Sequence, residues 1–164
     1  MSGGIQYRML RDSEVEAASE LARRVFDEFV AAQYSVEGQE EFHRYASPHS
    51  LRERHRAGCL TFAAEGDGRL VGMLHLRGGN HVAMLFVEGE SQRQGIGRGL
   101  LGAAIDYVLA RQPHIQALTV ASTPNAVAAY RTWGFVPVGR EQVLKGIRFI
   151  PMERQVGVSR RPQP

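Results

Sequence analysis

The chain has 164 residues, of which 43% are hydrophobic and 23% charged, and its net charge is +3. This composition is typical of a globular domain and excludes disordered, collagen-like and coiled-coil proteins. The single cysteine, Cys59, cannot form an internal disulfide, so we expect a reducing, cytoplasmic location. No segment has the roughly eighteen apolar residues of a membrane span, and the first residues lack a signal peptide's apolar core. We therefore expect one untargeted domain over residues 1–154, without a membrane partner, and a disordered tail over 155–164.

The positive charge is unevenly distributed along the chain. Residues 1–50 contain five arginines and nine acidic residues, a net charge of −4, whereas residues 51–164 carry +7. A basic half predicts an anionic partner, and scattered arginines suit the phosphates of a small molecule as well as nucleic acid. We do not expect nucleic-acid binding, because the arginines form no patch interleaved with exposed aromatic residues.

The first half of the chain predicts strands and amphipathic helices. Residues 5–9 alternate as a strand does, and an apolar stripe at helical spacing follows over about 13–32. Residues 34–57 predict two short helices separated at Ser47-Pro48, since serine caps a helix and proline suits its first turn. Three antiparallel strands are expected next, joined by glycine-containing turns, over 59–65, 69–76 and 81–87.

The second half predicts strands that alternate with helices. A polar, glycine-rich loop follows residue 87 and leads into an amphipathic helix that ends near residue 111. Residues 115–122 are nearly all apolar, as expected for a strand that is covered on both faces. A helix to about residue 132 and two strands, over 135–139 and 147–153, complete the pattern. The sequence therefore predicts an α/β fold with a mixed central sheet of six or seven strands and helices on both faces.

The loop over residues 92–98 has the composition of a phosphate-binding loop. Its glycines allow backbone N–H groups to converge, and the following helix begins with unpaired N–H donors. A plain flexible loop would have the same residues. A Walker loop is excluded because Lys145, the only lysine, lies far downstream. A dinucleotide site is not expected either, because the GxGxxG pattern at 97–102 begins ten residues after its strand and no acidic residue ends the next strand.

Three motifs, in this order along the chain, are similar to those of the GNAT superfamily of acyl-CoA-dependent N-acyltransferases. The loop over 92–97 resembles the family's cofactor loop, Gln/Arg-x-x-Gly-x-Gly/Ala. Asn125 and Tyr130, followed by Gly134-Phe135, resemble its second cofactor-contacting helix. Residues 147–152 resemble the closing strand of bacterial members. The resemblance spans most of the chain and implies a GNAT-like fold.

The resemblance implies acetyl-CoA as the acyl donor. The pyrophosphate of CoA would bind the amides of residues 92–97, and its pantetheine arm would pair with the strand end where the neighbouring strand diverges. Asn125 has local helix capping as an alternative role. The residues expected to bind the cofactor are Phe86, Val87, Gln92, Arg93, Gln94, Gly95, Ile96, Gly97, Arg98 and Asn125.

The resemblance also implies a catalytic role for Tyr130, as the general acid for the departing CoA thiolate. A phenol, with a pKa near 10, is a weaker acid than a thiol, with a pKa near 8.5. Tyr130 would therefore stabilise the thiolate by a hydrogen bond more than by protonating it. Without the motif, Tyr130 would be interpreted as a packing aromatic residue.

His81 and Glu88 are alternative candidates for the general base. Counted from the loop, His81 occupies the position at which some lysine-acetylating members of this superfamily have a carboxylate, and an imidazole suits base catalysis at neutral pH. It could equally be the first residue of a strand without further function. Glu88 ends the same strand beside the cofactor loop, but regular alternation places the two side chains on opposite faces unless a bulge intervenes.

The expected function is transfer of an acetyl group from acetyl-CoA to a primary amine on a small molecule, peptide or protein, by a monomer or homodimer. A non-catalytic acetyl-CoA sensor is the alternative. The six histidines show no metal-binding spacing, so we expect no metal. The segment over 33–58 and the final hairpin should select the acceptor. Its acidic and aromatic residues would suit a cationic amine or form a solvated helix face; they are Tyr34, Glu37, Glu40, Glu41 and Tyr45.

Overall fold

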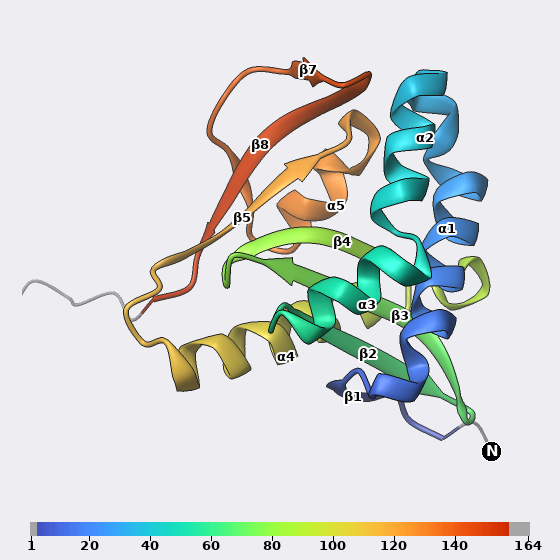
Figure 1. Ribbon diagram of the computed structural model, residues 1–164. Coiled ribbons are helices and arrows are strands. Elements are labelled where there is room, and N and C mark those ends of the chain that lie inside the picture. The colour runs from blue at the N-terminus through green and yellow to red at the C-terminus, as the bar shows by residue number, and fades with distance from the viewer. Residues whose placement is uncertain (1–2, 158–164) are drawn as a thin grey trace, which may run out of the picture.

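Eight strands form one sheet in the computed structural model, which describes residues 3–157 (Figure 1). The sheet order is β1-β2-β3-β4-β5-β8-β6, with β7 paired to β8; β4 and β5 are parallel, and the other neighbours are antiparallel. The strands are β1 (Gln6–Met9), β2 (Leu60–Gly66), β3 (Arg69–Arg77), β4 (His81–Val87), β5 (Ala117–Ser122), β6 (Val136–Pro137), β7 (Gln142–Leu144) and β8 (Ile147–Gln155). The expected mixed α/β fold is confirmed, with one strand more than expected. The additional strand, β7, has only three residues, all exposed, so no apolar alternation indicated it.

Five α-helices accompany the sheet within residues 3–157. They are α1 (Val15–Phe29), α2 (Val36–Tyr45), α3 (Pro48–Arg56), α4 (Ile96–Arg111) and α5 (Val127–Thr132). The predicted break between α2 and α3 is confirmed, because the Ser47 side chain accepts a hydrogen bond from the Ser50 N–H at 3.2 Å and Pro48 occupies the first turn. Helix α5 is shorter than expected, since residues 124–126 form a 3₁₀ turn before it.

The helices cover both faces of the sheet, and a separate apolar core lies on each face. Successive side chains of a strand point to opposite faces. Accordingly, Ala63 and Met73 pack with α1, whereas Phe62 and Leu74 pack with α4. Helices α1, α2 and α3 lie on the first face (Figure 1). The binary pattern of the strands therefore decides which helices the two faces receive.

The ordered chain extends beyond the expected start of the tail. Gln155 is the last residue of β8, and the Val156 and Gly157 N–H groups donate to the Gln116 carbonyl at 2.8 and 3.1 Å. The expectation of disorder is therefore wrong for residues 155–157. The rest of the expected tail, 158–164, lies outside the described residues. The single domain over 1–154 stays a prediction.

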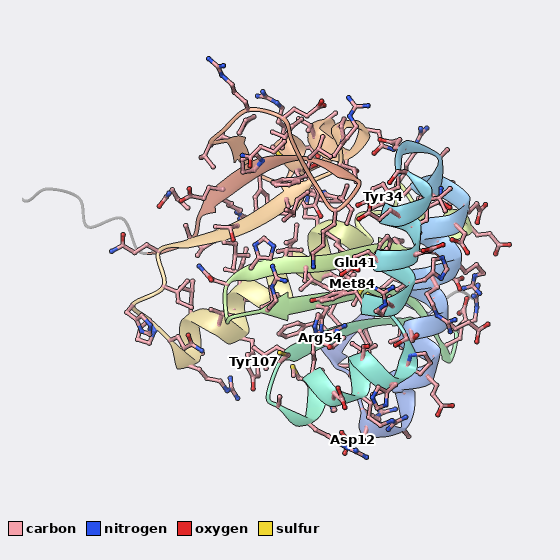
Figure 2. The ribbon with its side chains drawn as sticks, turned by 45° about the horizontal axis from the view of Figure 1, so that its top comes forward. Asp12, Tyr34, Glu41, Arg54, Met84 and Tyr107 are labelled. Atoms are coloured by element: carbon pink, nitrogen blue, oxygen red, sulfur yellow. The ribbon has the colours of Figure 1, made fainter. Side chains whose placement is uncertain are left out.

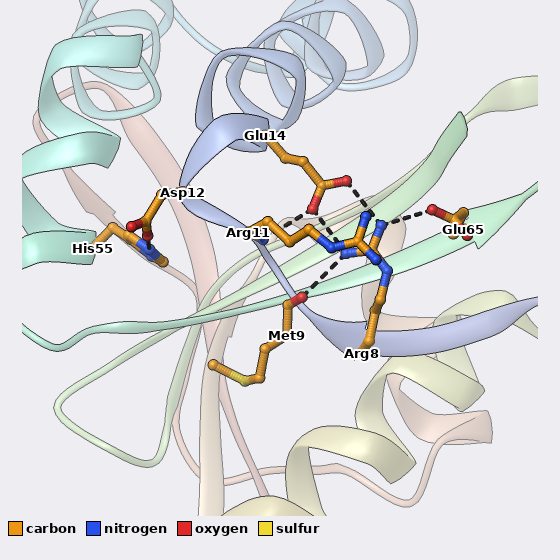
Figure 3. A network of polar contacts seen from close by, with 7 residues as sticks. All are labelled: Arg8, Met9, Arg11, Asp12, Glu14, His55 and Glu65. Atoms are coloured by element: carbon orange, nitrogen blue, oxygen red, sulfur yellow. Dashed lines mark hydrogen bonds and ion pairs between the residues drawn. The ribbon is translucent and has the colours of Figure 1, made fainter. Parts of the chain in front are cut away.

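Arg8 links the first strand to the start of α1 and to the neighbouring strand (Figure 3). Its guanidinium donates hydrogen bonds of 2.8 Å to both carboxylate oxygens of Glu14 and to Glu65 of β2. Glu14 also accepts a bond from the Arg11 N–H at 2.9 Å. Chiefly because of the bonds from Arg8, the pKa of Glu14 is lowered to about 2. The ionised carboxylate of Glu14 therefore stabilises the attachment of α1 to the sheet.

Substitution of Glu14 by glutamine is expected to remove a pH-dependent part of the stability. A carboxyl group whose pKa is lower in the folded state stabilises the fold above its unfolded pKa, and this contribution is lost as the pH falls from about 4.5 towards 2. Glu14→Gln should reduce the free energy of unfolding at neutral pH by about 1–2 kcal/mol. It should also flatten the pH dependence below 4.5. Urea unfolding at a series of pH values measures both effects.

Glu16→Gln is the matched control for this experiment. Its side chain is 77% exposed in the next turn and pairs with Arg52 at only 3.4 Å, so little change is expected. Equal acid slopes for the wild type and Glu14→Gln would contradict the proposed stabilising role of this carboxylate.

Candidate active site

A bulge in β4 separates this strand from β5. The pairing of β3 with β4 shifts at this point, where Leu76 opposes Val82 but His75 opposes Met84, so Ala83 is the extra residue. Parallel pairing of β4 with β5 is confined to His81–Thr119 and Val82–Val120. Beyond these pairs the two strands diverge (Figure 1). The backbone edges that face the gap have no ladder partner among the described residues, which leaves N–H and C=O groups for a ligand.

A cavity of about 530 Å³ occupies this gap and reaches both faces of the sheet. On the face of α4 and α5, its walls come from the predicted cofactor loop and the start of α4, and from residues 123–133. On the other face, its walls come from the end of α1, the connection to α2, and α2 itself. Tyr34 and Met84 mark this second end of the cavity (Figure 2). The cavity therefore offers two chemically different ends on opposite sides of one sheet.

The loop before α4 has the geometry that an anion requires. Gly95 has a left-handed conformation, with φ of 81°, directly before the helix. The first intrahelical bond of α4 runs from the Gly99 N–H to the Gly95 carbonyl at 2.9 Å, so the preceding amides have no acceptor within the helix. The Gln92 side chain donates to the Val87 carbonyl at 3.0 Å and so holds the loop against the end of β4. Arg93 and Arg98 also line this end and provide positive charge for a phosphate group.

Nine of the ten residues predicted to bind the cofactor line the cavity. Gln94 does not, because its side chain points back along the loop and donates to the Glu90 carbonyl at 3.3 Å. Asn125 lines the cavity, and its side-chain oxygen accepts a 2.7 Å bond from the Thr123 hydroxyl; it caps neither the 3₁₀ turn over 124–126 nor α5, because no side chain accepts a hydrogen bond from the first backbone N–H groups of these elements. The unpaired amides and the open strand edges fit the pyrophosphate and the amide-containing arm of CoA.

Tyr130 lines the cavity at the base of α5 and is only 8% exposed. Its ring packs edge to face against Trp133 and Phe135, with centroid distances of 5.3 Å in both pairs. Burial raises the pKa of the Tyr130 phenol, and the nearby Tyr34 raises it further. The hydroxyl therefore keeps its proton at neutral pH and can donate a hydrogen bond into the cavity.

The bulge also changes the relation between His81 and Glu88. Arg77 is the register partner of His81, and it lies on the same face of β3 as Met73, which belongs to the core on the α1 face. Glu88 is ion-paired to Arg24 of α1. Both residues therefore lie towards the α1 face, as the prediction allowed only if a bulge intervened. Neither lines the cavity.

The surroundings of the two candidate bases differ strongly. His81 directly precedes Val82, which does line the cavity, and its Nδ1 lies 2.8 Å from the Thr119 hydroxyl. Burial and, to a smaller extent, Arg77 lower its pKa, so the imidazole is neutral at physiological pH. Glu88 is bound by the guanidinium groups of Arg24 and, at 2.5 Å, Arg69. Its carboxylate is thus engaged in two charge-assisted interactions.

The wall on the α1 face consists mainly of residues that sequence reasoning assigned to packing or did not single out. Phe26 and Phe29 belong to the predicted apolar stripe of α1, and Phe42 lies in the first of the two short helices predicted over 34–57. Tyr34 lines the cavity as expected for an acceptor-selecting residue, but the acidic residues of α2 do not. Periodicity alone could not distinguish a stripe that packs on a sheet from one whose end borders a cavity.

Two kinds of feature are absent from the described residues, 3–157. No helix among them combines the length and apolar character needed to cross a membrane. Nor do they contain a group of three or more histidine, cysteine, aspartate or glutamate side chains arranged to hold a metal ion.

Gly97→Ala is expected to weaken acetyl-CoA binding. A Cβ atom at residue 97 would lie 2.6 Å from Cζ2 of Trp133, so the start of α4 and the wall of the cavity would have to separate. A forced contact of this kind costs about 1–3 kcal/mol, and we expect roughly tenfold weaker binding by calorimetry. Gly102→Ala in the same helix is the control. No atom lies within 4 Å of its added Cβ, so binding should be unchanged. Equal affinities of the two variants would refute the role of this contact.

Comparison with known proteins identifies the family to which the chain belongs. Residues 30–156 match the acetyltransferase (GNAT) domain family. Peptidyl-lysine N-acetyltransferase YiaC of Escherichia coli is 29% identical over 85 residues, which span 52% of this chain and 56% of that protein. A GCN5-related N-acetyltransferase of Rhodopseudomonas palustris has a similar structure, with a TM-score of 0.79 at 22% identity and coverage of 94% and 98% of the two chains. PaiA N-acetyltransferase of Thermoplasma acidophilum, in complex with coenzyme A, has a TM-score of 0.71 at 22% identity, with coverage of 93% of this chain and 99% of that chain. The chain therefore belongs to the GNAT acetyltransferases, a family of acetyl-CoA-dependent acyltransferases.

Proposed function

We propose that this protein transfers the acetyl group of acetyl-CoA to a primary amine by direct attack on the thioester. The observation that carries this proposal is the cavity through the sheet, which joins the amide loop on one face to a separate acceptor wall on the other. The Tyr130 hydroxyl belongs to the wall of the same cavity. Support also comes from YiaC, whose name describes acetylation of peptidyl-lysine. The single cysteine, Cys59, is consistent with a cytoplasmic enzyme.

The protein's own groups would organise this reaction around the gap between β4 and β5. Bound acetyl-CoA supplies an acetyl carbon that is activated as a thioester. The acceptor nitrogen forms a C–N bond to this carbon while the C–S bond breaks, the nitrogen loses a proton to a base, and the sulfur leaves as a thiolate. Tyr130, which stays protonated, donates a hydrogen bond to the thiolate.

We assign the base to His81, acting through a water molecule. An alkylamine has a pKa near 10.4, so a neutral nucleophile costs roughly 4 kcal/mol at physiological pH and a base lowers this barrier. His81 is neutral, and its ring is oriented by Thr119. It lies where β4 and β5 still pair, directly before Val82, which lines the cavity. Glu88 is the weaker candidate, because ion pairs with Arg24 and Arg69 occupy its two carboxylate oxygens.

A non-catalytic acetyl-CoA sensor is the alternative. It would use the loop end of the cavity but would not require an open acceptor end. The apolar wall on the α1 face, which continues from the loop end without interruption in one cavity, favours the enzyme.

Tyr130→Phe tests the role assigned to the hydroxyl. The substitution retains the ring that packs against Trp133 and Phe135, so the fold and acetyl-CoA affinity should be preserved. Loss of the hydrogen bond to the leaving group should lower kcat by about 10- to 100-fold. Release of free thiol from acetyl-CoA measures turnover, and calorimetry measures affinity. An unchanged kcat would eliminate the assigned role.

The pH dependence of activity discriminates between His81 and Glu88. Because the pKa of His81 is below its ordinary value of 6.5, the acid limb of kcat/KM should lie below pH 6.5, where the imidazole becomes protonated. His81→Asn should remove this limb and lower kcat/KM by about 100-fold. Glu88→Gln should retain the limb. The opposite result, with the limb lost only in Glu88→Gln, would transfer the role of base to Glu88.

A further inference from the structure

Aromatic rings form the acceptor end of the cavity. Phe26 is stacked on Phe42 with centroids 3.9 Å apart, and Tyr34 packs edge to face on Phe26 at 4.9 Å. Phe86 of β4 packs edge to face on Phe42 at 5.5 Å, and Phe29 completes the cluster. These five rings come from α1, the α1–α2 connection, α2 and β4. All five residues line the cavity on this side, so its wall here is mainly aromatic.

No acidic side chain among the described residues lines the cavity, and the charged residues in its walls, Arg93 and Arg98, belong to the loop end. Of the acidic groups on nearby elements, the Glu28 carboxylate lies beside Gly89, near Phe29 but outside the lining of the cavity. Asp27 pairs with His43 at 2.6 Å, and Glu88 pairs with Arg24 and Arg69.

Glu41, in α2, is also held in ion pairs. It pairs with Arg44 at 2.5 Å and with Lys145 at 3.8 Å. The two other acidic residues of α2, Glu37 and Glu40, are exposed and do not contribute to the walls. Of the two interpretations of these glutamates, the solvated face is therefore the correct one. The acceptor end has no carboxylate that could hold a second positive charge.

We infer that the acceptor is a small primary amine carried on an aromatic or branched apolar body, without a second cationic group. This inference rests on the proposed function and specifies its substrate class. The apolar body would lie against the ring cluster and be stabilised by the apolar surface that it buries. A diamine would have to place an ammonium group on the same surface without a carboxylate partner, which costs free energy. The aromatic wall therefore selects the body of the acceptor, and the selection is separate from the chemistry at its nitrogen.

Phe29 is the specificity-determining residue most accessible to experiment. Its side chain is 41% exposed at the end of α1, whereas Phe26 is 1% exposed and belongs to the core. A Cβ atom at Gly89 would lie 2.9 Å from Cζ of Phe29, which places the ring against the turn that follows β4. A substitution at residue 29 thus changes the edge of the cavity with little effect on the packing of the core.

The test compares phenethylamine with cadaverine, two primary alkylamines with similar nucleophilic groups and different bodies. We expect kcat/KM for phenethylamine to exceed that for cadaverine by about tenfold or more, measured by thiol release. Binding of both amines to the CoA-saturated protein, measured by calorimetry, should show the same order. Equal or tighter binding of cadaverine would overturn the inference, since the ring faces would then hold the ammonium group by cation–π attraction.

Phe29→Asp should weaken or abolish the preference. A carboxylate at the edge of the acceptor end would attract the second ammonium group of cadaverine and should shift the ratio of the two kcat/KM values by about tenfold in its favour. Val36→Asp is the matched control, because Val36 is 72% exposed on α2 and does not line the cavity. The same shift in both variants would overturn the assignment of the acceptor end.

The two proposals can fail separately. Absence of thiol release with every amine would contradict the proposed function, while the binding order would still test the inference. Transfer to cadaverine in preference to phenethylamine would leave the proposed function intact and refute the inference.

Discussion

The divergence of two parallel strands is the constraint on which the rest of this site depends. A parallel ladder between β4 and β5 would consume the backbone groups along both strands and close the sheet. The bulge at Ala83 ends this ladder after two residue pairs and leaves a gap that connects the two faces. Each face carries its own helices and its own apolar core, and residues of both cores, among them Met84 and Ile96, line the gap. The cavity forms because the pairing of β4 with β5 ends early. The cores on the two faces stabilise the fold around it.

The two ends of the cavity differ because different kinds of structure form them. Backbone amides and two arginines provide the loop end, where the polarity comes from a helix N-terminus and a left-handed glycine, Gly95. Side-chain rings provide the acceptor end, where the polar groups of α1 and α2 face solvent or one another. Tyr130, in α5, lines the same cavity as both ends. The loop end thus suits an anionic donor, and the acceptor end suits the apolar acceptor that we propose, on opposite faces of the sheet.

Ion pairs fix the elements around this cavity and leave its interior free of acidic groups. Arg8 joins β1, β2 and the turn before α1, and so sets the position of the helix whose far end borders the acceptor wall. Glu88 joins α1 to the end of β4 through Arg24 and to the start of β3 through Arg69. A carboxylate that is bound by two guanidinium groups holds the attached elements in place and is poorly suited to proton transfer. The same constraint favours the neutral imidazole of His81 for base catalysis.

The sequence by itself determined the local elements and the loop end of the cavity. The break at Ser47-Pro48 and the loop over 92–98 depend on capping, proline geometry and glycine conformations, which neighbouring residues specify. Only the tertiary structure decided the position of the bulge, the partners of Glu88 and the ring cluster that includes Phe29. The partners of Glu88 lie 64 and 19 residues away, and the cluster combines rings from α1, the α1–α2 connection, α2 and β4, which hydrophobic periodicity treats separately. Alternation assigns each residue to a face of its own element, but the contacts across the gap depend on how the two layers of helices pack on one twisted sheet.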